Sequence, residues 1–237
     1  YHMDKLDRTG GPLINIFGVD HGGYVKRMNA AVEALSGSKS MLDIRLCQLV
    51  NLMDQGKPVK MSRRAGTFIT VRDVIESVGA DVIRFIMLTR RSEQTIDFDF
   101  AKVTEQSRDN PVFYVQYAHA RACSVLRQTG DHAQNKAALD QLGDPAEMAV
   151  LRQLASWPKL VVSAANAHEP HRVAFYLMDL AAAFHALWTT GRENPELRFI
   201  REDAPALTAA RLRLVKATAL VIRSGLGVLA ITAREEM

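Results

Sequence analysis

Residues 109–121 read Asp-Asn-Pro-Val-Phe-Tyr-Val-Gln-Tyr-Ala-His-Ala-Arg, and they mark the point where the sequence turns to one helix after another. Asn110 can cap a helix through its side-chain oxygen. Pro111 suits the first helical position because its missing N–H needs no partner there. Amphipathic patterns with short polar connections follow, and the expected helices cover residues 111–128, 145–166, 170–191 and 208–229. Such a series predicts a helical bundle.

Several residues in these helices are expected to limit them. Pro158 should bend or interrupt the second helix, because proline removes a helical hydrogen bond. Gly191 is expected to end the third helix, and Gly225 and Gly227 are candidates to break the fourth.

One face of the first expected helix gathers aromatic and basic side chains. Tyr114 and Tyr117 lie three residues apart and Arg121 follows one turn later, so the three share a face. Aromatic rings stack on unpaired bases, and arginine binds phosphates or base edges. The alternative is that both tyrosines belong to the core, with their hydroxyl groups at its edge, and the spacing alone leaves both interpretations open.

The last expected helix carries Arg213, Lys216 and Arg223 on one face. Such a stripe is usually a solvated surface, and it can also contact phosphates. Across the chain, 30 basic residues against 26 acidic ones give a net charge of +4. A mildly basic protein fits a nucleic-acid partner, although this charge alone decides nothing.

The first part of the chain, before residue 106, alternates strand and helix signals. The expected strands cover residues 12–17 and 42–52, with a helix as the alternative for 42–52, and the expected helices cover 24–35, 71–78 and 82–88. Thr70 and Asp73 have the spacing of a capping box, and Asp81 is expected to cap the helix after it. Residues 89–100 are predicted to be a loop or an edge strand.

Composition narrows the class of protein. Hydrophobic residues make up 48% of the 237-residue chain, enough for a buried core. Cys47 and Cys123 lie far apart without a CxxC pattern, which argues against a zinc site and a disulfide framework. No signal peptide and no membrane-spanning run are recognised. The opening at Tyr1 is interpreted as the middle of a longer protein.

Two short segments have the residue types that nucleotide chemistry needs. Residues 16–23, Ile-Phe-Gly-Val-Asp-His-Gly-Gly, follow a buried strand. There Gly18 allows close backbone approach to a nucleotide, Asp20 can accept from a ribose hydroxyl, and His21 can stack or hydrogen-bond. Residues 60–64, Lys-Met-Ser-Arg-Arg, form a basic loop whose cations can stabilise a leaving pyrophosphate. Without other evidence, this loop would be interpreted as a solvated surface.

Together these segments resemble one family. Residues 60–64 resemble the KMSK loop of class I aminoacyl-tRNA synthetases, with Arg63 in place of the final lysine. Residues 16–23 resemble the GxDH segment of the same class. Residues 109–121 resemble the opening of the anticodon-binding domain of arginyl-tRNA synthetases. The resemblance covers almost the whole chain.

The resemblance implies a mostly α fold in two domains. Residues 1–105 would be the C-terminal part of a Rossmann-type α/β catalytic domain, and residues 106–237 an all-α helical-bundle anticodon-binding domain. The family's HIGH motif is absent from the 237 residues, so this chain by itself is not expected to form arginyl-adenylate.

The resemblance also implies a function, the ATP-dependent attachment of L-arginine to tRNA(Arg) through arginyl-adenylate. ATP would be a substrate, accompanied by Mg²⁺, and the enzyme would be a cytoplasmic monomer without a membrane partner. The site residues carried over are Lys60, Ser62 and Arg63 for catalysis; Gly18, Asp20, His21, Lys60 and Met61 for ATP; and Tyr114, Tyr117, Arg121, Arg213 and Met237 for tRNA. No metal ligand is expected from the chain.

Two alternatives stay open on the sequence. One is a non-catalytic tRNA-binding module. The other is a different class I synthetase such as the cysteinyl type, which the missing zinc ligands and residues 114–121 disfavour. The remaining histidines that were considered, His132, His168, His171 and His185, are interpreted as incidental, and His185 as a core histidine between apolar residues.

Overall fold

The computed structural model describes residues 1–59, 69–105, 110–129 and 136–237. The chain divides into two compact units, which are treated separately below. Unit 1 combines Tyr1–Lys60 with Arg90–Asp99, and unit 2 combines Met61–Thr89 with Phe100–Met237. The basic loop predicted at residues 60–64 lies outside the described residues.

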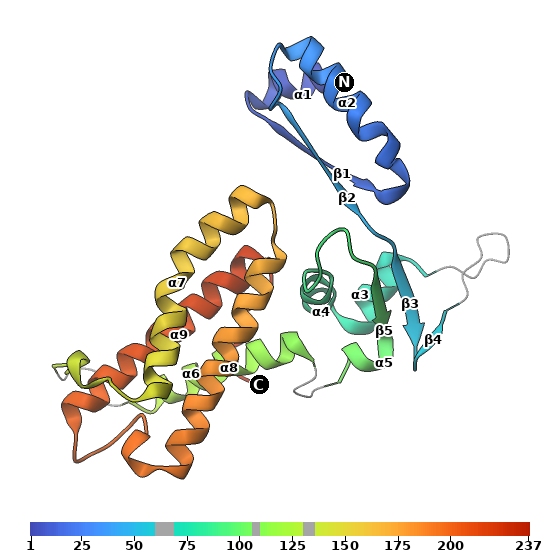
Figure 1. The fold of residues 1–237 in the computed structure, drawn as a ribbon. Coiled ribbons are helices and arrows are strands. Elements are labelled where there is room, and N and C mark those ends of the chain that lie inside the picture. The colour runs from blue at the N-terminus through green and yellow to red at the C-terminus, as the bar shows by residue number, and fades with distance from the viewer. Residues whose placement is uncertain (60–68, 106–109, 130–135) are drawn as a thin grey trace. The chain divides into compact units, whose positions relative to one another are not determined.

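Unit 1 begins with a parallel strand pair. Strand β1 (Leu13–Gly18) runs beside β2 (Leu42–Cys47), with Leu13 opposite Leu42 and Gly18 opposite Cys47 (Figure 1). Parallel strands need a crossover, which helix α2 (Val25–Ser36) supplies. Helix α1 (His2–Thr9), which was not predicted, adds Leu6 to a small core shared with Val32 of α2. The strand expected at 12–17 and the helix expected at 24–35 are confirmed.

A second sheet completes unit 1. Strand β3 (Val50–Asp54) lies between β4 (Lys57–Pro58), to which it is antiparallel, and β5 (Ile96–Asp99), to which it is parallel. Gln55 and Gly56 have φ values of 48° and 77°, as expected for the two-residue turn between β3 and β4. The single strand predicted at 42–52 is therefore two strands, β2 and β3. The edge strand anticipated within residues 89–100 is confirmed as β5.

Unit 2 opens with two short helices. Helix α3 (Val71–Val78) begins with the predicted capping box, in which Thr70 Oγ1 accepts from the N–H of Asp73 and Asp73 Oδ2 accepts from the N–H of Thr70. Helix α4 (Ala80–Met87) starts directly after Gly79. The prediction that Asp81 caps this helix is wrong, because Asp81 already lies within its first turn. The short helix α5 (Phe100–Val103) follows.

Four long helices make the bundle of unit 2 (Figure 1): α6 (Pro111–Arg127), α7 (Pro145–Ala167), α8 (His171–Glu193) and α9 (Pro205–Val228). The short 3₁₀ helices η3 (Leu139–Gln141) and η4 (Pro195–Leu197) lie in the connections. Helices α6, α8 and α9 supply most of one core, with Val115, Leu180 and Ile222 fully buried. The mostly α fold expected from the sequence is confirmed.

The predicted helix breakers do not act as breakers. Helix α7 continues through the exposed Pro158, so this proline does not interrupt it. Gly191 lies inside α8, and a Cβ atom there would come within 2.8 Å of the carbonyl oxygen of Leu197. At Gly225, inside α9, a Cβ atom would come within 2.7 Å of Leu177 Cδ2. These two glycines serve close packing instead.

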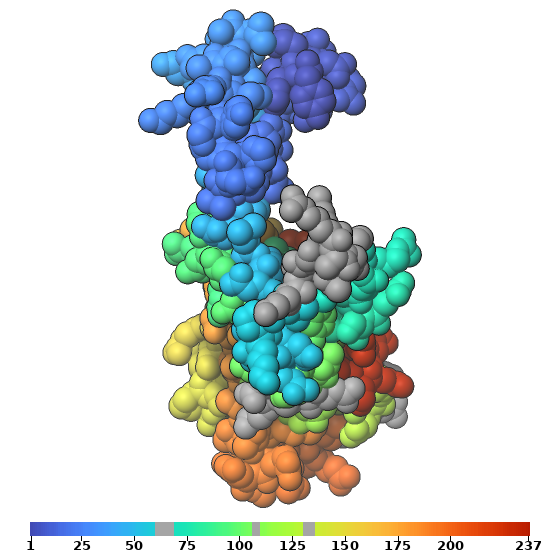
Figure 2. Space-filling model, turned by 90° about the vertical axis from the view of Figure 1, so that its right-hand side faces the viewer, coloured from blue at the N-terminus to red at the C-terminus, as the bar shows by residue number. Residues whose placement is uncertain are grey.

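The sequence was expected to contain no segment long and apolar enough to cross a membrane, but helix α8 meets that criterion. By length and composition only, it is the one candidate among the described residues, with a mean hydropathy of 1.2 in its most apolar window. Half of that window is buried inside the protein. The residues of α8 and of the connection after it are also visible at the surface (Figure 2, orange). This distribution is typical of the core helix of a bundle.

Candidate nucleotide and nucleic-acid sites

The first candidate site lies in unit 1, at the carboxyl end of β1. The chain leaves the strand at Gly18 and enters the 3₁₀ helix η1 (Val19–Tyr24). A Cβ atom at Gly18 would come within 2.5 Å of Asp20 Oδ1, the end of an exposed side chain, and the backbone at Gly18 is extended with φ of -66°, so the absence of a side chain here leaves room beside Asp20. Because β1 and β2 are parallel, their carboxyl ends meet at one edge, where open α/β sheets bind ligands.

The side chains at this edge can meet a nucleotide. Asp20 Oδ2 lies 3.5 Å from His21 Nε2, and the two side chains are 76% and 56% exposed. The His21 ring lies between Phe17 and Tyr24, with centroid separations of 5.9 and 6.0 Å. The structure therefore brings Gly18, Asp20 and His21 together. Lys60, Met61, Ser62 and Arg63, predicted to complete this site, lie outside the described residues.

The second candidate site lies in unit 2, on α6. The guanidinium of Arg121 lies between two aromatic rings, 4.5 Å from the centroid of Tyr117 and 4.6 Å from that of Trp188 on α8. Its Nη2 donates to the Tyr117 hydroxyl at 2.9 Å. Contact with both rings and hydrogen bonds to Tyr117 and His185 restrict the orientation of the planar guanidinium. Sequence reasoning found Tyr117 and Arg121 and missed Trp188.

His185 also belongs to this cluster. Arginine only donates, so His185 Nδ1 accepts from Arg121 Nη1 at 2.8 Å, and the proton on Nε2 faces the carbonyl oxygen of Tyr114 at 3.3 Å. The residue is buried, as predicted, but it is not incidental, because it positions Arg121. A signal was present in the sequence: His185 and Trp188 are three residues apart and so share a face of their helix.

The two tyrosines have different environments. Tyr114 is half-buried against the hydrophobic core, and its ring centroid lies 4.5 Å from that of His185. Tyr117 is 37% exposed and stacks on Phe113 at 6.0 Å. Tyr117 is therefore the more exposed of the two tyrosines, while Phe113, Arg121 and His185 all contact its ring.

Two cavities are lined in part by Tyr117. One of about 440 Å³ is lined by Arg121, Trp188 and Met237, among others. The other, of about 620 Å³, is lined by Phe113 and again by Met237. Met237, which is 48% exposed, thus lines both cavities together with Tyr117.

Arg213, the remaining predicted site residue, is exposed on α9 near Lys216 in sequence. Arg223 of the same stripe pairs with Glu235 at 2.8 Å. Across the part of the chain that the structure describes, no ion-pair partner is found for Arg213 or Lys216. Among the same residues no group of three or more His, Cys, Asp or Glu side chains could hold a metal ion.

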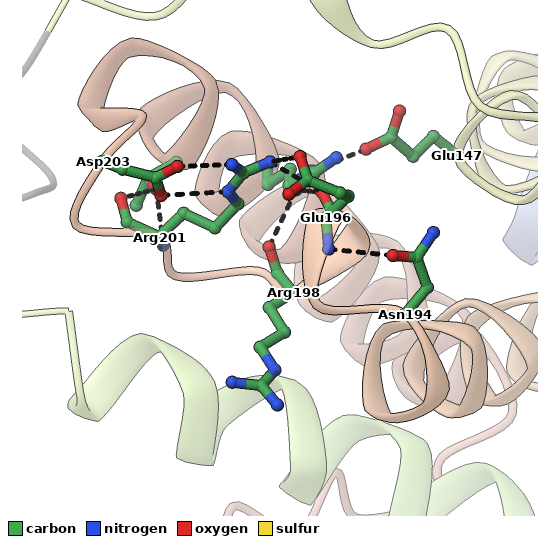
Figure 3. A network of polar contacts seen from close by, with 8 residues as sticks. Glu147, Asn194, Glu196, Arg198, Arg201 and Asp203 are labelled. Atoms are coloured by element: carbon green, nitrogen blue, oxygen red, sulfur yellow. Dashed lines mark hydrogen bonds and ion pairs between the residues drawn. The ribbon is translucent and has the colours of Figure 1, made fainter.

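A polar network that the sequence did not reveal supports the bundle. The connection after α8 folds through Asn194, Glu196, Arg198, Arg201 and Asp203 (Figure 3). Arg201 pairs with both Glu196 and Asp203. Arg211 on α9 donates to the backbone carbonyls of Glu196 and Arg198 at 2.7 and 2.9 Å. The network fixes an irregular connection against α9.

Comparison with known proteins identifies the helical part. Residues 115–237, more than half of the chain, match the family described as the DALR anticodon binding domain. The chain belongs to this family. The DALR match begins inside α6 and includes Tyr117, Arg121, His185, Trp188 and Met237.

Other matches cover all or nearly all of this chain. The arginine–tRNA ligase of Ruegeria pomeroyi is 56% identical over 244 residues, covering all of this chain and 42% of the relative. A solved structure from Campylobacter jejuni, assigned as an arginyl-tRNA synthetase, aligns with a TM-score of 0.84 and 34% identity over 100% of this chain and 50% of its own. The Thermus thermophilus arginyl-tRNA synthetase aligns with a TM-score of 0.74 and 28% identity, over 95% of this chain and 41% of its own.

These matches confirm the resemblance to arginyl-tRNA synthetases that the sequence suggested. The chain spans 42% of the length of the curated relative from Ruegeria pomeroyi. The match to this relative includes the residues before the DALR domain as well as the domain itself.

Proposed function

We propose that this chain is part of an arginine–tRNA ligase, which activates L-arginine with ATP and transfers it to tRNA(Arg). The observation that carries the proposal is the 56% identity to an arginine–tRNA ligase along the whole chain, together with the DALR family match. We assign residues 1–105 to the catalytic domain and residues 106–237 to the tRNA-reading domain.

Activation needs no nucleophile from the protein. The carboxylate of arginine attacks the α-phosphate of ATP, forming arginyl-adenylate and releasing pyrophosphate. A ribose hydroxyl of the tRNA then attacks the arginyl carbonyl, and AMP leaves. Catalysis would rest on positioning and on stabilising the charge of the leaving group.

Gly18, Asp20 and His21 would hold the nucleoside at the carboxyl edge of β1. The exposed Asp20 carboxylate can accept from a ribose hydroxyl, and the His21 ring offers a stacking surface. Lys60 and Arg63 would neutralise the pyrophosphate, with Ser62 as a hydroxyl donor and Met61 beside the nucleotide. Their loop charges would act most strongly in the transition state.

An Mg²⁺ ion is proposed to accompany ATP and to neutralise part of its phosphate charge. Protein Mg²⁺ sites of this kind use one or two carboxylates together with the phosphates of the substrate.

In unit 2, Tyr117 would stack on an unpaired base, and Arg121 would present a preorganised guanidinium beside it. Arg213 would contact a phosphate, and Met237 would border the same cavities as Tyr117. We further propose a cytoplasmic enzyme, since Cys47 and Cys123 are both free thiols, as is usual in a reducing compartment. A monomer stays a prediction, which sedimentation velocity can check.

Amino-acid-dependent ATP–pyrophosphate exchange tests the proposal. The complete ligase that contains this chain is assayed with each amino acid in turn, in the presence of tRNA(Arg). Exchange that depends on L-arginine alone is expected. Exchange stimulated by cysteine or by another amino acid would contradict the assignment, as would a folded protein that activates none.

A further inference from the structure

The last residues of the chain lie in unit 2 as an irregular segment after α9. Leu229 and Ile231 anchor its start in the bundle, being 4% and 5% exposed. Ala230 between them takes a left-handed conformation with φ of 53°, which turns the chain out of the helix. Residues 232–237 then continue without a helix or strand. Their backbone groups need partners from outside regular secondary structure.

Side chains supply the first of these partners at Thr232. Its N–H donates to Asp81 Oδ1 at 3.3 Å, and its carbonyl oxygen accepts from Gln116 Nε2 at 2.9 Å. Gln116 Nε2 also donates to Asp81 Oδ2 at 3.3 Å. Asp81 on α4, Gln116 on α6 and the backbone of Thr232 thus close a three-membered hydrogen-bond ring. Gln116 is only 4% exposed, so its amide cannot readily exchange these partners for water.

Helix α6 holds the segment at two further points. The fully buried His119 donates from Nδ1 to the carbonyl oxygen of Arg234 at 2.8 Å. Arg127 Nη1 donates to the carbonyl oxygen of Glu235 at 3.3 Å. His119 follows Gln116 by three residues, so the two share a face of the helix. The segment is therefore attached at Thr232, Arg234 and Glu235, and Met237 after it lines the same cavities as Tyr117.

Gln116, His119 and Arg127 on α6 make three of the hydrogen bonds to the backbone of residues 232–235. Asp81 on α4 makes the fourth. We propose that Asp81, acting through Gln116 and Thr232, is a positioning residue that holds residues 232–237 in the tRNA-binding surface. This inference rests on the proposed function, because it treats the cavities beside Tyr117 and Met237 as that surface.

The two cysteines provide a readout of segment docking that does not depend on tRNA. Cys123 is 9% exposed, and its Sγ lies 3.8 Å from His119, beneath the contact with Arg234. Burial raises the pKa of its thiol, and nearby Glu235 adds to this rise. Release of the segment should therefore make Cys123 react faster with a thiol reagent. Cys47 lies in unit 1 and serves as the internal control.

The experiment compares Asp81→Ala, Asp81→Asn and a chain ending at Ile231 in the complete ligase. Asp81→Ala is expected to raise the KM for tRNA(Arg) about tenfold, as for the loss of a hydrogen bond to a charged group, while the KM for ATP stays unchanged. Peptide-resolved labelling should show faster reaction at Cys123 and not at Cys47. Asp81→Asn keeps one acceptor oxygen and should recover part of the affinity. Asp179→Ala, at an exposed acidic position on α8, is the matched control.

The truncated chain separates positioning from a general structural effect. If Asp81 acts through residues 232–237, adding Asp81→Ala to the truncation should change the KM for tRNA no further. Unchanged labelling and unchanged KM in a folded Asp81→Ala protein would overturn the proposal, and so would faster Cys123 labelling with a normal KM. A wild-type ligase that neither binds nor charges tRNA(Arg) would instead refute the proposed function, whatever the labelling shows.

Discussion

Arg211 Nε lies 2.7 Å from Glu147 Oε1, and the two side chains are only 5% and 2% exposed. The other oxygen of Glu147 accepts from the N–H groups of Gly143 and Asp144, both at 3.2 Å. Arg211 also donates to the connection after α8. One ion pair therefore joins the beginning of α7, that connection and α9, with both carboxylate oxygens of Glu147 and the Nε and Nη1 atoms of Arg211 hydrogen-bonded.

Glu147→Ala should leave the Arg211 guanidinium buried without its carboxylate. Breaking a buried pair by removing one partner typically costs about 3–5 kcal/mol of unfolding free energy. Urea unfolding followed by circular dichroism measures this loss. Glu202→Ala, at an exposed position, serves as the control and should change stability little. A loss below about 1 kcal/mol for Glu147→Ala would mean that water readily replaces the carboxylate.

His119 should make stability depend on pH. Burial lowers its pKa below the ordinary 6.5, so the unfolded chain binds a proton at pH values where the folded chain does not. The free energy of unfolding should therefore fall as the pH drops from 6.5 through the folded-state pKa. Arg223 adds to the lowering, whereas the Arg234 carbonyl and Glu235 oppose it.

His119→Gln tests this assignment because glutamine keeps an N–H donor for the Arg234 carbonyl and does not titrate. Thermal unfolding is followed at several pH values between about 5 and 8, around the ordinary histidine pKa. The variant should lose less stability than the wild type toward the acidic end. Parallel curves for the two proteins would show that His119 contributes nothing to the pH dependence.

Lys60→Ala should slow adenylate formation far more than it weakens arginine binding. Its charge is proposed to act on the leaving pyrophosphate, and removing one such electrostatic contact typically costs on the order of a hundredfold in rate. Pre-steady-state formation of arginyl-adenylate by the complete ligase measures the effect. A variant that reacts at the normal rate would make Lys60 a surface charge.

Arg213→Ala should reduce the salt dependence of tRNA binding. Loss of one phosphate contact lowers the slope of log Kd against log salt by about one. Arg192→Ala, on an exposed part of α8, is the charge-matched control. Equal slopes for the Arg213 variant and the wild type would place Arg213 outside the tRNA contact.

Local signals predicted much of the fold. The Thr70–Asp73 capping box, the Asn110–Pro111 helix start and the strand before Gly18 all depend on neighbours in sequence, and the structure contains each of them. Gly191 and Gly225 misled the prediction because their role is set by contacts outside their own helices, with Leu197 and Leu177. Close packing between elements leaves no pattern within one helix.

The candidate sites show the same division. The face of Tyr117 and Arg121 could be predicted from helical spacing on α6 alone. Trp188 and His185 join it only because α8 packs beside α6, and Asp81 reaches Thr232 across 151 residues of sequence. Such pairings require the tertiary fold, and they decide which predicted residue is exposed and which is held in place.

The central claim is that the exposed face of α6 binds tRNA(Arg), and equilibrium binding of that tRNA to the complete ligase tests it most directly. Tyr117→Ala should weaken binding by roughly 1–3 kcal/mol, the usual contribution of one aromatic–base stack, and leave ATP binding intact. Phe175→Ala, which removes an aromatic ring 42% exposed on α8, should bind normally. Tyr114→Ala should mainly lower stability, since that ring packs on His185 and the core. A folded Tyr117→Ala protein that binds tRNA(Arg) as tightly as the wild type would contradict the account.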